Sequence, residues 1–141
     1  IIPNTDTTLT IPSTSERVIT VGAYDSANIS TVGFSGRGYT RATEYIKPDL
    51  VAPGVNILTT TVGESITSFT GTSAAAPFVA GSAALLMEWG IVDRNDIFLY
   101  GERLKAFLCN GAIRDNSREY PNREWGYGRL CLKNTLDLLK K

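Results

Sequence analysis

One segment, residues 73–89, constrains the fold more than any other part of this 141-residue chain. Its residues are small or apolar at almost every position, so a helix built from them would be apolar on every face. Such a helix is typical of a protein interior, and the small Gly81 and Ser82 would let neighbouring backbones come close. Pro77 is compatible with it if it lies near the first turn, where a backbone donor is little needed. We therefore expect a buried helix here, ended by Gly90.

Short strand-like runs precede this helix. Residues 17–23 are rich in β-branched side chains, which favours a buried strand. The apolar run between Pro48 and Pro53 allows a strand of only about three or four residues. The runs at residues 55–62 and 65–70 predict a hairpin.

Two further helices are predicted after the apolar helix. Residues 95–110 have apolar side chains at helical spacing, although Gly101 weakens the middle, and Gly111 suits the C-cap. Residues 132–139 place three leucines on one helix face. Strands therefore come first and helices later, with no internal repeat.

The composition excludes several classes of protein. Lys+Arg and Asp+Glu each total 14, so the formal net charge is zero and nothing indicates a nucleic-acid or acidic-membrane partner. The sequence contains no run of about 18 apolar residues, so we expect no transmembrane helix. The chain contains no histidine, so a His-based general base, proton shuttle or metal ligand cannot come from it. A site that depends on histidine would have to be completed from outside.

The two cysteines, Cys109 and Cys131, indicate neither a zinc site nor a disulfide framework. They form no C-x-x-C motif, and a zinc site takes about four ligands. We expect buried thiols, and the sequence leaves a disulfide between them open.

The candidate for chemistry is Ser73, two residues after Gly71 and at the start of the apolar helix. Glycine before it would let a substrate backbone approach and would permit unusual dihedral angles. A helix N-terminus offers unpaired N–H groups and a partial positive charge, which favour a developing oxyanion beside the serine. Position alone nevertheless favours a plainer role, in which Thr72 or Ser73 only caps the helix.

Four sequence blocks resemble those of subtilisin-like serine proteases, in the family's order and spacing. The first, Gly71-Thr72-Ser73-Ala74-Ala75-Ala76-Pro77 followed by Val79-Ala80-Gly81, resembles the nucleophile motif of that family. The others are Val18-Ile19-Thr20-Val21-Gly22-Ala23, Lys47-Pro48-Asp49-Leu50-Val51-Ala52-Pro53-Gly54 and Trp125-Gly126-Tyr127-Gly128-Arg129-Leu130. Together they favour a nucleophilic serine over a helix cap.

The resemblance implies an α/β fold: the C-terminal part of the family's three layers, a parallel sheet flanked by helices, incomplete in this chain. Residues 16–141 would form the C-terminal half of the catalytic domain. Residues 1–15, rich in Thr, Ser and Pro, would be a linker or the end of an inserted β-rich domain. The chain begins without Met or the regions of a signal peptide, so we expect a processed or excised segment.

By the same likeness Ser73 would be the nucleophile and its backbone N–H an oxyanion donor, while Gly71 and Thr72 would border the substrate. The family's catalytic Asp and His and its oxyanion-hole Asn normally precede the matched stretch, so the chain alone is expected to be inactive. Ala74 and Phe78 differ from the family's commonest residues, Met and His, at positions that transfer no proton. The resemblance implies no cofactor and no metal in this chain; calcium, common in the family, stays open for the complete protein.

The implied partners are a peptide or protein substrate and the remaining half of the catalytic domain. Without that half, apolar surface would be exposed, and we expect the chain to self-associate as a dimer or by swapping strands, or to be only marginally stable. Residues 9–14 and 99–105 together resemble clostridial and related Firmicute subtilases, which include the spore-germination proteases. That likeness implies a secreted, cell-surface or spore-associated protein of a Gram-positive bacterium. The alternative is a non-catalytic subtilase-like pseudoprotease that binds a ligand or senses germination signals.

Overall fold

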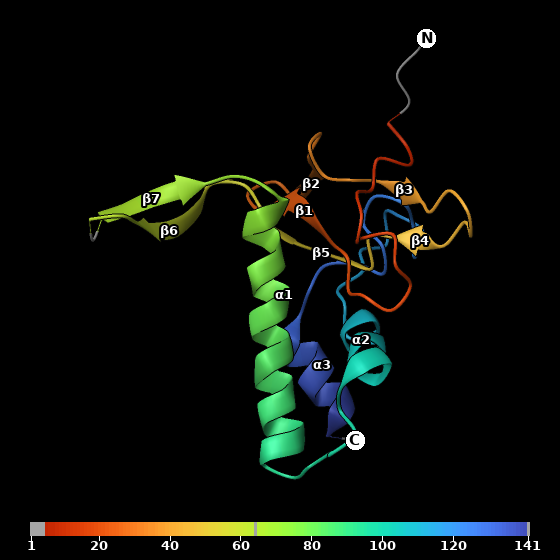
Figure 1. The fold of residues 1–141 in the computed structure, drawn as a ribbon, viewed down its shortest axis with the longest axis vertical. Helices are drawn as coiled ribbons and strands as arrows, with labels where there is room; N and C mark the ends of the chain where they lie inside the picture. Colours follow the sequence, from red (N-terminus) through yellow and green to blue (C-terminus); the bar gives the residue numbers. More distant parts are fainter. Residues whose placement is uncertain (1–4, 64, 141) are drawn as a thin grey trace.

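The centre of the molecule is a small sheet with one parallel pair of strands (Figure 1). The computed structural model describes residues 5–63 and 65–140. Strand β1 (Val21–Asp25) pairs in parallel with β5 (Leu50–Pro53) and antiparallel with the short β2 (Ser30–Thr31). Both β1 and β5 are buried, which explains their small and β-branched side chains. The strand predicted over residues 17–23 begins only at Val21, and the proline-bounded strand is confirmed.

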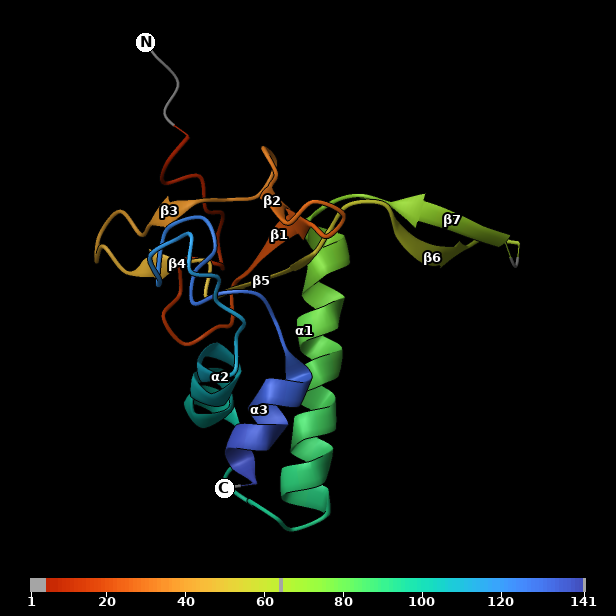
Figure 2. The same ribbon diagram turned by 180° about the vertical axis from the view of Figure 1, so that it is seen from behind.

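Two further strand pairs lie beside this sheet. Strands β3 (Gly38–Tyr39) and β4 (Ile46–Lys47) form a short antiparallel pair. Strands β6 (Ile57–Thr61) and β7 (Ser65–Phe69) form the predicted hairpin, which projects away from the body of the molecule in both ribbon views (Figures 1 and 2). The hairpin leads directly into the long helix.

The apolar segment forms helix α1 (Thr72–Met87), which continues as a π-helical turn, η1 (Glu88–Val92). One side of α1 packs on β1 and β5 through residues such as Ala75 and Val79. On the other side, Phe78 is 42% and Leu85 55% exposed. The prediction of a helix buried all round and ended at Gly90 is therefore wrong. The pattern identifies apolar side chains, but it cannot show whether a neighbouring element covers them.

Pro77 lies in the second turn of α1, not the first. Its nitrogen has no proton to give to the carbonyl of Ser73, four residues earlier, which thus loses its ordinary helical donor. The sequence-based placement of this proline is therefore one turn too early.

Helices α2 (Gly101–Asn110) and α3 (Leu132–Leu139) complete the core. Helix α2 begins where a weak middle was expected: Gly101 has a φ of 55°, and the residues before it are not helical. The predicted C-cap, Gly111, and the predicted limits of α3 are both confirmed. The three helices lie together on one side of β1 and β5 (Figure 2). The α/β fold class is thereby confirmed.

Among the residues that the structure describes, one helix is long and apolar enough to cross a membrane by length and hydropathy alone, contrary to expectation. The stretch Thr72–Val92 has 21 residues and a mean hydropathy of 1.5. A core helix of a soluble protein meets the same criterion. One side of α1 packs on β1 and β5, although only 22% of the stretch is buried.

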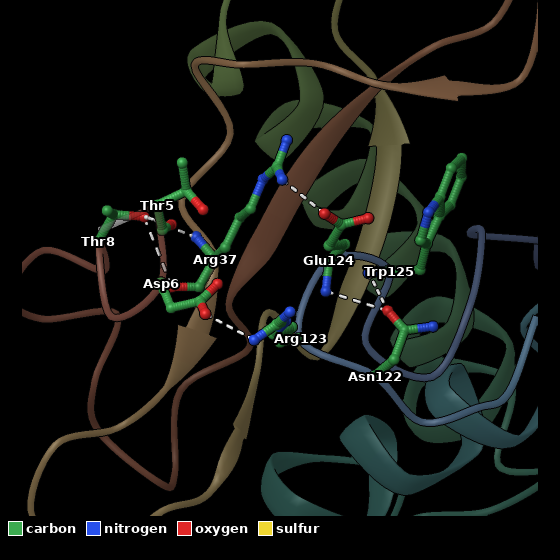
Figure 3. A network of polar contacts seen from close by, with 8 residues as sticks. All are labelled: Thr5, Asp6, Thr8, Arg37, Asn122, Arg123, Glu124 and Trp125. Atoms are coloured by element: carbon green, nitrogen blue, oxygen red, sulfur yellow. Dashed lines mark hydrogen bonds and ion pairs between the residues drawn. The ribbon is translucent and has the colours of Figure 1, made fainter. Parts of the chain in front are cut away.

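The residues before β1 are tied to the body by polar contacts (Figure 3). The N–H of Thr8 donates to the carbonyl of Arg37 at 3.0 Å, and the N–H of Arg37 donates to the Thr8 hydroxyl at 2.9 Å. Arg123 pairs with Asp6, and Arg37 with Glu124, each at 2.5 Å. Of the segment predicted as a linker or the end of an inserted domain, residues 1–4 lie outside the described part, and residues 5–15 form turns and bends.

Candidate active site

Ser73 lies exposed in the first turn of α1. The N-cap is Gly71, and no side chain caps the helix, so the capping role considered for Thr72 or Ser73 is wrong. Among residues 5–63 and 65–140 the Ser73 hydroxyl has no hydrogen-bond partner. Backbone geometry alone therefore places this hydroxyl.

Backbone hydrogen bonds fix the start of α1 at the carboxyl ends of β1 and β5. The N–H of Gly54 donates to the carbonyl of Tyr24 at 3.0 Å, and the N–H of Gly71 donates to the carbonyl of Gly54 at 2.8 Å. The N–H of Asn56 donates to the Thr70 hydroxyl at 2.9 Å. In α/β folds ligands bind outside the carboxyl ends of parallel strands, which is where Ser73 lies.

The first turn of α1 leaves two backbone donors free. Within the described residues the N–H groups of Thr72 and Ser73 find no acceptor, as is usual at a helix N-terminus. The partial positive charge of the helix end acts at the same place. These groups can stabilise an oxyanion that forms beside Ser73.

Gly71 is not held in an unusual conformation. Its φ of 161° is extended backbone, and a Cβ there would meet no described atom closer than 3.6 Å, at Phe69. The expectation of special dihedral angles is therefore wrong, because the loop reaches the helix in an extended form. If Gly71 borders the substrate as predicted, it does so because it leaves space for the substrate and not because its backbone is strained.

Two cavities meet at Ser73. The larger, about 900 Å³, extends along Thr72 and Ser73 towards the residues that precede β1. The smaller, about 370 Å³, lies between α1 and the hairpin. Its walls are mainly apolar, with Phe69 from β7, Pro77 and Phe78 from α1 and Ile57 from β6. Of the three predicted site residues, Ser73 lines both cavities and Thr72 lines the larger one, whereas Gly71 lines neither and directly precedes them as the N-cap of α1.

No metal site accompanies this serine in the part of the chain that the structure describes. Nowhere in it do three or more Cys, Asp or Glu side chains gather in a group that could hold a metal ion. Cys109 and Cys131 are both free thiols; Cys109 is buried as predicted, whereas Cys131 is only half-buried.

Sequence reasoning missed a buried charge cluster, Lys47, Asp49 and Lys105. The Asp49 carboxylate accepts from Lys47 and from the backbone N–H of Thr20 on one oxygen, at 2.8 and 2.7 Å, and pairs with Lys105 at 2.8 Å on the other. Burial lowers the pKa of Lys47. Burial also opposes the charge of Lys105, but Asp49 outweighs it and raises the pKa of that lysine.

One signal could have revealed this cluster: two charged residues beside an otherwise apolar, proline-bounded strand. A cavity of about 650 Å³ adjoins the cluster, and its lining does not include Ser73. The fully engaged carboxylate indicates a structural role for the cluster.

Comparison with known proteins agrees with this geometry. Residues 2–128 match the model of the Subtilase family. Serine protease AprX of Bacillus subtilis is 32% identical over 149 residues, which cover 92% of this chain and 32% of the relative. Minor extracellular protease Vpr of the same species is 33% identical over 116 residues, covering 73% of this chain and 13% of the relative.

The solved CspB protease of Clostridium perfringens superposes with a TM-score of 0.96 at 50% identity, over all of this chain and 31% of that protein. The chain thus spans about a third of the length of AprX and of CspB. The match extends over β1, β5 and α1, the elements that position Ser73. The fold is accordingly a part of the subtilisin-like α/β fold, and the chain belongs to the subtilase family.

Proposed function

We propose that Ser73 is the nucleophile of a serine endopeptidase that hydrolyses peptide bonds. The observation that carries this proposal is the position of Ser73, which is exposed and lines two cavities. Its hydroxyl and the backbone N–H groups of Thr72 and Ser73 have no partner among the described residues. A serine with these neighbours can attack a carbonyl that lies in the junction of the cavities, while the donors stabilise the oxyanion. The sequence relatives named above are proteases, which supports the same reaction.

The reaction would follow the acyl-transfer scheme of serine hydrolases. The Ser73 oxygen bonds to the peptide carbonyl carbon as its proton passes to a general base. The carbonyl oxygen becomes an oxyanion beside the Ser73 N–H. Collapse breaks the C–N bond, the base returns the proton to the leaving amine, and an acyl-serine remains. Water, deprotonated by the same base, then releases the acid and regenerates Ser73.

The base would come from residues other than these 141, because the chain has no histidine. We propose that a second part of the catalytic domain supplies a His and the Asp that orients it, so this chain alone is inactive. The uncovered side of α1, with Phe78 and Leu85, is the surface we assign to that part. In this scheme residues 16–141 are the C-terminal half of the domain, and residues 1–15 lead into it.

Gly71 and Thr72 would border the bound substrate, because Thr72 lines the larger cavity beside Ser73 and Gly71 directly precedes it as the N-cap of α1. The substrate class is a peptide or protein. We further propose that the protein acts outside the cell or at its surface, as the name of the extracellular relative states for that protein.

A fluorophosphonate probe tests the proposed nucleophile in the complete protein. The probe should label Ser73, the Ser73→Ala variant should lose both label and peptidase activity, and Ser68→Ala should keep both. Ser68 is a suitable control because it is an exposed serine on β7, outside both cavities. A folded protein that stays unlabelled would support the non-catalytic alternative, a binding or sensing protein on a subtilase scaffold.

A further inference from the structure

Gly54 lies in tight contact with two parts of the structure, the sheet and the loop that leads to Ser73. A Cβ at this position would come within 2.6 Å of the Ala23 Cβ and 2.9 Å of the Gly71 carbonyl oxygen. Real side chains do not approach so closely, so an added methyl group must displace one neighbour. Ala23 is 2% exposed in the central strand and packed into the core. Gly71, half-buried at the end of the hairpin, is therefore the neighbour that would move.

The same contact fixes where α1 begins. The two backbone hydrogen bonds from Tyr24 through Gly54 to Gly71, at 3.0 and 2.8 Å, join the sheet to the N-cap of α1. The Thr70 hydroxyl adds a third link when it accepts the N–H of Asn56 at 2.9 Å. Because the Ser73 hydroxyl makes no bond of its own within the described residues, these links decide where it lies.

We propose that Gly54 and Thr70 are positioning residues for Ser73: they hold the N-terminus of α1 so that the serine hydroxyl meets the scissile carbonyl. This inference rests on the proposed nucleophilic role of Ser73. Neither residue touches the reacting atoms; each acts through the backbone of Gly71. A misplacement of about 1 Å at a reacting group can lower a rate by about 100-fold, so small shifts of this loop should change the turnover number.

Four variants of the complete protein test the proposal. Gly54→Ala should lower kcat by about 10- to 100-fold, because Ser73 moves together with Gly71, and should change KM less, because most of the cavity lining stays in place. Thr70→Val keeps the shape but removes the acceptor, and should lower kcat by about fivefold, the equivalent of one ordinary hydrogen bond. Thr70→Ser restores the acceptor and should restore kcat. Thr60→Val is the matched control, since Thr60 is an exposed threonine of β6 whose hydroxyl has no partner among the described residues.

Two further measurements separate positioning from general stability. The melting temperature reports the fold, and the rate of fluorophosphonate labelling at Ser73 reports the placement of the nucleophile. We expect Gly54→Ala and Thr70→Val to slow labelling at temperatures where both variants are fully folded. A wild-type kcat and labelling rate in folded Gly54→Ala, with only a lower melting temperature, would overturn the proposal.

Failure of the positioning role can be told from failure of the nucleophile. If Ser73→Ala keeps full activity, the proposed function itself is wrong. If Ser73→Ala is inactive while the Gly54 and Thr70 variants react at the wild-type rate, only the positioning role is wrong. A rate loss in Thr70→Val that Thr70→Ser does not restore would also contradict it, since the hydroxyl would then not be the cause.

Discussion

Lys105 of α2 and Asp49, directly before β5, form an ion pair of 2.8 Å in the interior, where the aspartate side chain is only 4% exposed. The other Asp49 oxygen accepts from Lys47 and from the N–H of Thr20. Lys105 also donates to the carbonyls of Glu16 and Val18. This single carboxylate therefore joins α2, the entry to β5 and the segment that leads into β1.

Removing the charge of Asp49 should destabilise the fold strongly. Asp49→Asn leaves the buried ammonium group of Lys47 and the half-buried one of Lys105 facing a neutral amide, and breaking a buried pair in this way costs about 3–5 kcal/mol. Urea denaturation monitored by circular dichroism measures the loss. Asp137→Asn is the control: it breaks the surface pair Lys133–Asp137 and should change the free energy of unfolding little. Equal effects of the two substitutions would contradict the structural role assigned to Asp49.

The buried Cys109 thiol makes stability fall at alkaline pH. Burial, followed by the negative charge of Asp49, raises the pKa of Cys109 to about 12, compared with 9.0 for a free thiol. Between these values the unfolded chain loses the proton and the folded chain keeps it, so the contribution to stability is present below pH 9 and declines as pH rises. By pH 10.5 the decline should reach about 2 kcal/mol, at about 1.4 kcal/mol per pH unit.

A comparison of variants isolates this effect from the lysines, which also titrate in that range. The free energy of unfolding at pH 8 and pH 10.5, under reducing conditions, should show a smaller decline for Cys109→Ala than for the wild type. Cys131→Ala retains the buried thiol and should keep the wild-type decline. An identical decline in all three proteins would show that Cys109 stays protonated, or ionised, equally in the folded and unfolded states.

The sequence predicts best those elements whose signal is local. The hairpin β6–β7, the strand between Pro48 and Pro53 and the helix α3 follow from alternation, from proline and from spaced leucines. Helix α2 starts later than predicted because Gly101 takes a positive φ, so it opens the helix instead of weakening its middle. A single sequence cannot tell these two uses of glycine apart.

What the sequence could not predict depends on contacts between distant segments. The partners of Asp49 lie on β4 and α2, so the buried cluster exists only once the chain has folded. The sequence likewise cannot predict that one side of α1 is exposed, because apolar composition does not show which neighbouring element covers a helix face. The sequence motif alone predicts Ser73 as the candidate nucleophile, whereas the contact between Gly54 and Gly71 beside it is visible only in the structure.

Helices α2 and α3 meet at a contact that leaves no space for a side chain at Gly111. A Cβ there would come within 2.7 Å of the Thr135 backbone and closer still to its hydroxyl, and Thr135 is completely buried. Gly111 has an ordinary φ of −78°, so Gly111→Ala introduces crowding without backbone strain. We expect a loss of about 1–3 kcal/mol, typical of overpacking. Gly33→Ala is the matched control, since a Cβ at Gly33 meets nothing within 4 Å of the described structure; its thermal unfolding should stay close to wild type.

The uncovered side of α1 should make the 141-residue chain associate with itself. Phe78 and Leu85 are 42% and 55% exposed on the side of α1 that faces away from β1 and β5, and apolar surface of this kind favours association in water. Light scattering coupled to gel filtration should give a mass above the 15.3 kDa of one chain.

Two variants test whether this face causes the association. Leu85→Glu should return the mass towards that of a monomer, because a charge is tolerated at an exposed position but not inside an interface between two chains. Lys133→Glu, a charge change on the exposed surface of α3, should leave the association unchanged. A wild-type chain that stays monomeric at high concentration would show that this face needs no partner, and would remove the support it gives to a second catalytic half docking there.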